Sequence, residues 1–109
     1  TAEEMAQHLQ NSLQRAPLLI KGDNRSIKRV AWCTGAAQRY LQNAIDLGAD
    51  AYITGEVSES TVHLARESGR HFFAAGHHAT ERYGVKSLGE HLAQQFDICV
   101  EFIDINNPA

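Results

Sequence analysis

The sequence "GHHATE" (76–81) places two adjacent histidines about one helical turn before a glutamate. If a helix begins near His77, the side chains of His77 and Glu81 project from the same face, one turn apart. An imidazole and a carboxylate at this spacing can bind one divalent cation, or the carboxylate can bridge two. His78 and Glu81, three residues apart, form a competing pair. The alternative is structural: both histidines cap the helix, and Glu81 interacts with its dipole.

Glu56 is a second candidate for chemistry, because it follows Gly55 at the end of an apolar run. Its carboxylate could bind a metal directly, orient a metal ligand, or act as a general base. It could equally be an acidic residue in the first turn of the next helix, where the helix dipole favours it. Ser58 and Glu59 fit the cap of that helix.

The elements that must position these residues alternate between strand and helix. Helices are predicted over 2–14, 36–48, 58–69 and 78–96, and strands over 17–22, 27–35, 50–56, 70–76 and 98–105. The order α-β-β-α-β-α-β-α-β predicts an α/β fold with a mostly parallel, mixed sheet and helices packed on it. The first strand is expected at an edge, where it can run antiparallel.

Three of the predicted strand ends carry distinctive residues, in "CTG" (33–35), "TGE" (54–56) and "AGHH" (75–78). Ligands collect beyond the carboxyl ends of strands in such sheets, so we expect these ends to form one site. The sequence has no GxxxxGK[ST] or GxGxxG motif, which makes a phosphate loop at "CTG" a weak prediction.

The apolar runs from residue 27 onward predict strands that are buried on both faces. Trp32 is therefore expected in the core, and Cys33 and Cys99 are expected to be buried free thiols of a cytosolic protein. His71 begins a strand and is predicted to lie near the surface.

Length and charge limit the possible functions. The chain has 109 residues, the size of one domain, and a net charge of −3. This charge argues against general binding to nucleic acids or anionic membranes, and no apolar run is long enough to span a bilayer. The chain begins at Thr1 without a methionine and enters a helical pattern at once, so we expect it to be a piece of a longer protein.

Four stretches carry a resemblance to a known family: "RVAWCTGAAQ", "DAYITGEVSESTVHLARESG", "FFAAGHHATERYGVKSLGEHLA" and "VEFIDINNPA". Together they resemble the C-terminal half of the YbgI-like or Nif3-like proteins, the GTP cyclohydrolase 1 type 2 homologs. The resemblance covers residues 27–109, and residues 1–26 fit as the preceding helix and strand. The chain is thus expected to be a single α/β domain over residues 1–109.

The resemblance implies cytoplasmic proteins about twice this length, which form toroidal homohexamers with a dinuclear metal centre in each subunit. The metal ions would be Fe, Mn or Zn. His77 and Glu81 match the family's ligands from this half, whereas a His-His pair and an Asp come from the other half. Because that half has no counterpart in this sequence, the complete site is not expected to form within the chain.

The family name implies metal-activated water acting on a nucleotide, either GTP or a damaged nucleotide, with Glu56 as an orienting residue or base. The chain alone is expected to be inactive. A phosphoester or amide hydrolase is an alternative within the enzymes. The alternative from another class is a module for assembly or metal binding, without turnover, in a toroidal homo-oligomer.

Overall fold

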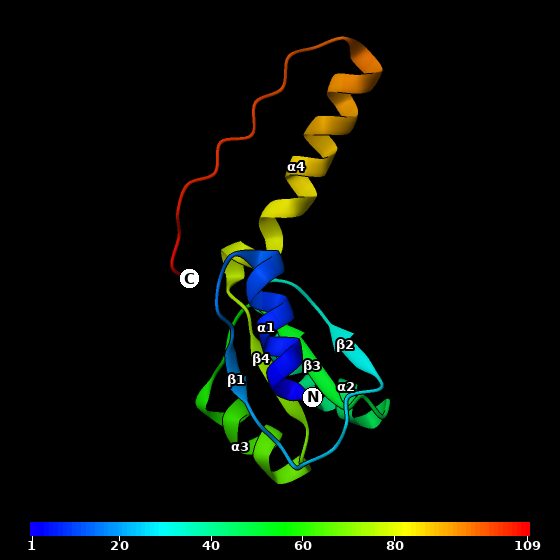
Figure 1. Ribbon diagram of the computed structural model, residues 1–109, viewed down its shortest axis with the longest axis vertical. Helices are drawn as coiled ribbons and strands as arrows, with labels where there is room; N and C mark the ends of the chain where they lie inside the picture. The colour runs from blue at the N-terminus through cyan, green and yellow to red at the C-terminus, as the bar shows by residue number, and fades with distance from the viewer.

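The computed structural model describes residues 1–109 (Figure 1). Its elements, in chain order, are α1 (Ala2–Leu13), β1 (Leu18–Ile20), β2 (Val30–Trp32), the 3-10 turn η1 (Gln38–Tyr40), α2 (Leu41–Asp46), β3 (Ala51–Thr54), α3 (Glu59–Ser68), β4 (His71–Ala74) and α4 (His77–Phe96). The predicted elements up to residue 96 are therefore confirmed in type, and most are shorter than predicted.

The four strands form one mixed sheet in the order β1-β4-β3-β2. β2, β3 and β4 run parallel, with Val30 opposite Ala51 and Ala51 opposite His71. β1 pairs with β4 in the antiparallel sense, with Leu19 opposite Phe73. The predicted fold class and the antiparallel edge strand are confirmed.

Helices cover both faces of the sheet, because successive side chains of a strand point to opposite sides. Phe72 packs with residues of α2 and α3, such as Leu41 and Ala65, in one core cluster. Phe73 faces the other way and packs with Ala2 of α1 in a second cluster. Phe72 and Phe73 are both fully buried, and β4 is one of the two inner strands of a three-layer body.

The distal part of α4 leaves this body (Figure 1). The molecule measures 52 × 25 × 24 Å, and its radius of gyration is 15.8 Å, against about 13 Å for a compact chain of this length. Ala79 is the only buried residue of α4. Residues 98–105, here the C-terminal segment, run back beside the helix; α4 from Gly84 onward and this segment are called the arm.

The structure corrects four predictions. The strand predicted over 98–105 does not form within this chain. Trp32 is 74% exposed rather than part of the core, and Cys33 and Cys99 are exposed free thiols. Trp32 lies at the end of β2, an edge strand covered less fully than the central strands, so continuous burial on both faces fails there.

His71 is the fourth correction, because it is buried rather than near the surface. Its Nδ1 accepts a hydrogen bond from the Gly22 N–H (3.3 Å), so Nε2 carries the proton and donates to Arg25 O (3.1 Å). The two hydrogen bonds of the ring therefore hold the loop between β1 and β2 against β4. None of the helices combines the length and apolar character needed to cross a bilayer.

Candidate metal centre at the carboxyl ends of the strands

The carboxyl ends of the three parallel strands meet, as the sequence predicts. The Gly55 N–H donates to Gly35 O (2.9 Å), and the Gly76 N–H donates to Gly55 O (3.0 Å). The Thr54 hydroxyl also donates to Gly35 O (3.1 Å). Residues that follow β2, β3 and β4 are therefore joined directly by hydrogen bonds at one edge of the sheet.

Two of these glycines allow the backbone to approach the candidate site closely. Gly35 has φ +68°, and a Cβ there would overlap Glu81 Oε1 and lie 3.2 Å from His77 Nε2. A Cβ on Gly55 would lie 2.7 Å from His77 Cα and 2.7 Å from Gly35 O. Any larger residue at either position would displace the groups that form the site.

His77 is held between two carboxylates. Its Nδ1 lies 2.7 Å from Glu56 Oε1, and its Nε2 lies 3.1 Å from Glu81 Oε2. The pKa of His77 is raised, first by the hydrogen bond with Glu56 and then by the charge of Glu81, whereas partial burial acts in the opposite direction. The three side chains are partly accessible, with exposures of 37% for His77, 42% for Glu56 and 50% for Glu81.

The start of α4 argues against the capping and helix-dipole alternatives for these residues. α4 begins at His77 with Gly76 as its N-cap, and no side chain caps the helix. The first turn of α4 carries no acidic residue, so Glu81 lies too far along to act at the helix N-terminus. Glu56 likewise precedes α3, which begins at Glu59, and is not a first-turn residue.

His78 lies outside this group. Its Nε2 is 2.9 Å from Asp104 Oδ1, and the other carboxylate oxygen accepts a hydrogen bond from Arg82 Nη1 (3.0 Å). The structure therefore brings together Glu56, His77 and Glu81, and it gives His78 a different partner on the C-terminal segment.

Sequence reasoning missed Thr80 and Asp104. The Thr80 hydroxyl accepts a hydrogen bond from the Gly35 N–H (3.1 Å) and donates to Gly76 O (2.9 Å), so it ties α4 to the loop after β2. The position of Thr80, one turn after Gly76, is the signal that could have identified it. Asp104 carries no such local signal, because its partners lie more than 20 residues away in the sequence.

A groove of about 530 Å³ adjoins the site. His77 and Glu81 of α4 line it together with Phe102, Ile103 and Asn107 of the C-terminal part of the chain. The groove gives the candidate site an open approach from solvent and includes both polar and apolar side chains.

The donor atoms fit part of a metal site. Two ligand atoms at ordinary metal distances from one ion stand roughly 3 to 3.4 Å apart, and His77 Nε2 and Glu81 Oε2 are 3.1 Å apart. Glu56 on Nδ1 matches the carboxylate that commonly orients a metal-binding histidine. Glu56 and Glu81 contact different ring nitrogens of His77, and residues 1–109 contain no group of three or more His, Cys, Asp or Glu side chains that could hold an ion.

The fold and the site together define the class of this protein. It is an α/β protein with a mixed sheet and a cluster of His and Glu side chains at the carboxyl edge of that sheet. The chain belongs to the Duf34/NIF3 (NGG1p interacting factor 3) family, whose model matches residues 1–108. This finding confirms the family expected from the sequence.

Relatives from two bacteria share about half of the residues. The chain is 57% identical over 106 residues to a Pseudomonas aeruginosa protein and 54% identical over 110 residues to a Yersinia pestis protein. Both are named "GTP cyclohydrolase 1 type 2 homolog". The alignments cover 97% and 99% of this chain but 42% and 44% of the relatives, so the chain spans less than half of their length.

Solved structures show the same fold. The protein ybgI, described as of unknown function, superposes with a TM-score of 0.94 at 52% identity, over 99% of this chain and 44% of that one. A protein from Thermus thermophilus superposes with a TM-score of 0.86 at 28% identity, over 100% of this chain and 44% of that one.

Proposed function

We propose that this chain supplies His77 and Glu81 to a dinuclear metal centre of a hydrolase-like protein. The observation that carries the proposal is the arrangement Glu56–His77–Glu81, in which Nδ1 faces one carboxylate and Nε2 faces another across 3.1 Å. A divalent ion could take the place of the contact between Nε2 and Glu81. Fe, Mn and Zn all suit this mixed imidazole and carboxylate donor set.

The residues of the chain have distinct roles in this proposal. Glu56 accepts a hydrogen bond from the Nδ1–H of His77, which fixes the tautomer and leaves the Nε2 lone pair free for metal. Glu81 supplies a carboxylate that can bind one ion or bridge two. Bound divalent ions would activate water near neutral pH and polarise the bond to be cleaved.

The remaining ligands, a His-His pair and an Asp, would come from the part of the family's length that this chain does not span. The relatives' name supports GTP as the substrate, and we extend the proposal to damaged nucleotides. The groove beside His77 is the candidate binding place. We place the assembled protein in the cytoplasm as a homohexamer. The chain on its own is expected to be inactive.

The first test uses the full-length Pseudomonas aeruginosa relative, loaded with Mn²⁺, Zn²⁺ or Fe²⁺ and assayed with GTP and oxidised nucleotides. Alanine at the positions aligned with His77 and Glu81 should abolish turnover and lower the bound metal. Alanine at the position aligned with His78 is the matched control and should retain the metal. Equal metal content in all three variants would contradict the ligand assignment.

The second test uses this chain alone in a calorimetric titration with the same ions. With only two side chains as ligands, the chain should bind the ion weakly. His77→Ala should remove that binding, whereas His78→Ala should not. Tight stoichiometric binding by the 109 residues would show that the site is complete here. Binding should also weaken as the pH falls, because a proton on Nε2 competes with the metal.

The second candidate function is a non-catalytic module for assembly or metal binding. The exposed apolar side chains of α4 favour it, because they suit a surface committed to another polypeptide. If the full-length relative binds metal through the same residues but turns over no candidate substrate, this alternative is favoured over the hydrolase.

A further inference from the structure

The C-terminal segment (98–105) is extended, yet no backbone N–H or C=O of its eight residues takes part in a backbone hydrogen bond. Its composition, "ICVEFIDI", is rich in the β-branched and aromatic residues that favour strands. A run of unpaired backbone groups in an extended chain is a template for another strand. The segment therefore has the conformation and the composition of a strand without a neighbour.

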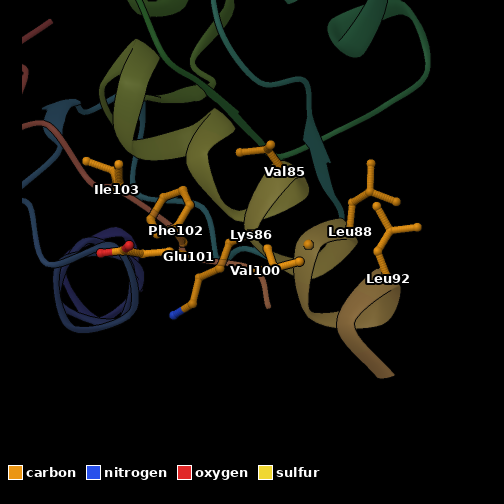
Figure 2. Close-up of a pocket in the computed structure, with 9 residues that line it drawn as sticks. Val85, Lys86, Leu88, Leu92, Val100, Glu101, Phe102 and Ile103 are labelled. Atoms are coloured by element: carbon orange, nitrogen blue, oxygen red, sulfur yellow. The ribbon is translucent and has the colours of Figure 1, made fainter. Parts of the chain in front are cut away.

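α4 lies against this segment and leaves an apolar groove open to solvent. The groove has a volume of about 390 Å³. Figure 2 draws the residues that line it, which come from the distal half of α4 and from the segment. The approach is close at one point, where a Cβ on Gly89 would lie 2.8 Å from Val100 Cγ1. Helix and segment thus form a two-element layer.

The side chains of this layer are poorly covered. Val85, Leu88 and Ile103 are 63%, 56% and 72% exposed. The accessible surface of the chain is 7104 Å², whereas a compact monomer of this mass has about 6,000 Å². The excess of roughly 1,100 Å² exceeds the approximately 800 Å² that each partner buries in a standard protein interface.

Asp104 fixes the position of the segment against the candidate metal site. Its two carboxylate oxygens contact His78 (2.9 Å) and Arg82 (3.0 Å) near the start of α4. Phe102 and Ile103 line the groove that also contains His77 and Glu81. A strand added beside the segment would therefore pass close to that site.

We propose that residues 98–105 are one strand of a second sheet, and that the neighbouring strand belongs to the part of the family's polypeptide that this chain does not span. α4 covers one face of that sheet. The length of the relatives supports this occupant, since more than half of it lies outside the 109 residues. The interface is a β-strand addition, in which backbone hydrogen bonds supply the pairing and the apolar groove supplies the burial.

Amide hydrogen exchange tests the pairing directly. In this chain the amides of 98–105 should exchange as fast as those of an unstructured peptide. In the full-length Pseudomonas aeruginosa relative, the aligned amides should exchange at least about 100-fold more slowly, as ladder amides do. The amides of β4 are the internal control, because β4 is paired in this chain without the missing part of the polypeptide. Fast exchange of the segment in the full-length relative would overturn the proposal.

Proline substitution provides a second readout. Neighbouring N–H groups of a strand point in opposite directions, so Val100→Pro and Glu101→Pro together sample both sides of the segment. In this chain both should shift the melting temperature by less than about 2 °C relative to Val100→Ala and Glu101→Ala. In the full-length relative at least one of the aligned prolines should lower the melting temperature well below its alanine control.

A second copy of this chain is the competing occupant, and sedimentation distinguishes it. If the chain is a dimer at micromolar concentration, and its 98–105 amides are protected only in the dimer, the second copy pairs with the segment and our proposal is wrong. Neither this outcome nor the exchange result depends on metal binding, so the test is independent of the proposed metal centre.

Discussion

The three-layer body and the arm use apolar side chains in opposite ways. In the body, Phe72 and Phe73 of β4 are fully buried, and helices cover both faces of the sheet. In the arm, the apolar side chains of α4 and the C-terminal segment line an open groove. The helices of both regions are regular, whereas the C-terminal segment of the arm has no strand beside it, so the difference lies in what covers each region.

The candidate metal site lies at the junction of the two regions, which explains its partial form. The body supplies the strand ends and the glycines, and the first turns of α4 supply His77 and Glu81. Beyond the junction the arm offers no further ligand from residues 1–109. The two candidate ligands are thus positioned at the edge of a buried sheet, and the uncovered surface begins further along the same helix.

The largest contrast is expected from truncating one apolar residue in each region. Phe72→Ala should lower the free energy of unfolding by about 3–5 kcal/mol, because it leaves a cavity against Tyr52 and α3. Leu88→Ala, in the arm, should cost less than about 1 kcal/mol, because the side chain is 56% exposed. Urea denaturation followed by circular dichroism measures both.

Phe72→Leu extends this test if Phe72→Ala fails to fold, and it should cost roughly 1–2 kcal/mol. Similar losses for the variants at Phe72 and Leu88 would mean that the arm is covered as well as the sheet, and the contrast between the regions would be lost.

Adding a methyl group at a glycine tests the contrast between the body and the arm in the opposite way to truncation. Gly55→Ala places a methyl group 2.7 Å from Gly35 O and from His77 Cα, both backbone atoms, and should destabilise the chain by about 1–3 kcal/mol. A methyl group on Gly84 would meet nothing within 4 Å, so Gly84→Ala should stabilise α4 by about 0.5–1 kcal/mol. Thermal unfolding should shift in opposite directions for the two variants.

The body was predictable from the sequence because its signals are local. Alternation of apolar runs with amphipathic helices identified the sheet, and the residues at the strand ends located Glu56, His77 and Glu81 at one edge. The hydrogen bonds from Gly55 to Gly35 and from Gly76 to Gly55 follow from parallel pairing of the strands.

The arm was not predictable in the same way, because its state depends on what lies beside it. "ICVEFIDI" has the composition of a strand, but a strand needs a neighbour and none of the four strands pairs with it. The burial predicted for Trp32 and Cys33 was wrong for a related reason. An apolar run does not reveal whether a strand is central or at an edge. Burial of His71 depends on Gly22 and Arg25, far away in the sequence.

Asp50 provides a smaller, pH-dependent effect in the body. The Lys28 N–H and Arg29 N–H both donate to its Oδ2 (2.9 Å each), and these bonds, with Arg25 and Arg70 nearby, lower the pKa of Asp50. A lowered folded-state pKa stabilises the fold above the unfolded value of about 3.9, and this stability is lost as the pH falls through the folded pKa.

Asp50→Asn should therefore cost about 1–2 kcal/mol at about pH 7, and the difference from the parent chain should shrink below about pH 4. Urea denaturation from roughly pH 3 to pH 7 measures both quantities. A difference that stays constant over this range would assign the loss to packing rather than to the carboxylate charge.

The smallest effect on stability is expected at Asp104, where the arm joins the body. Its pKa is also lowered, mainly by the hydrogen bond with His78, but the side chain is 43% exposed and tethers only the C-terminal segment. Asp104→Asn should leave the melting temperature of this chain nearly unchanged, because no buried element depends on the carboxylate. What should change is local: His78 and Arg82 lose a charged partner, and the segment should move more freely on the nanosecond timescale, which NMR relaxation of its amides can detect. A melting temperature lowered as much as in Asp50→Asn would mean that the arm contributes to the stability of the body, and the two regions could no longer be treated as separately stabilised.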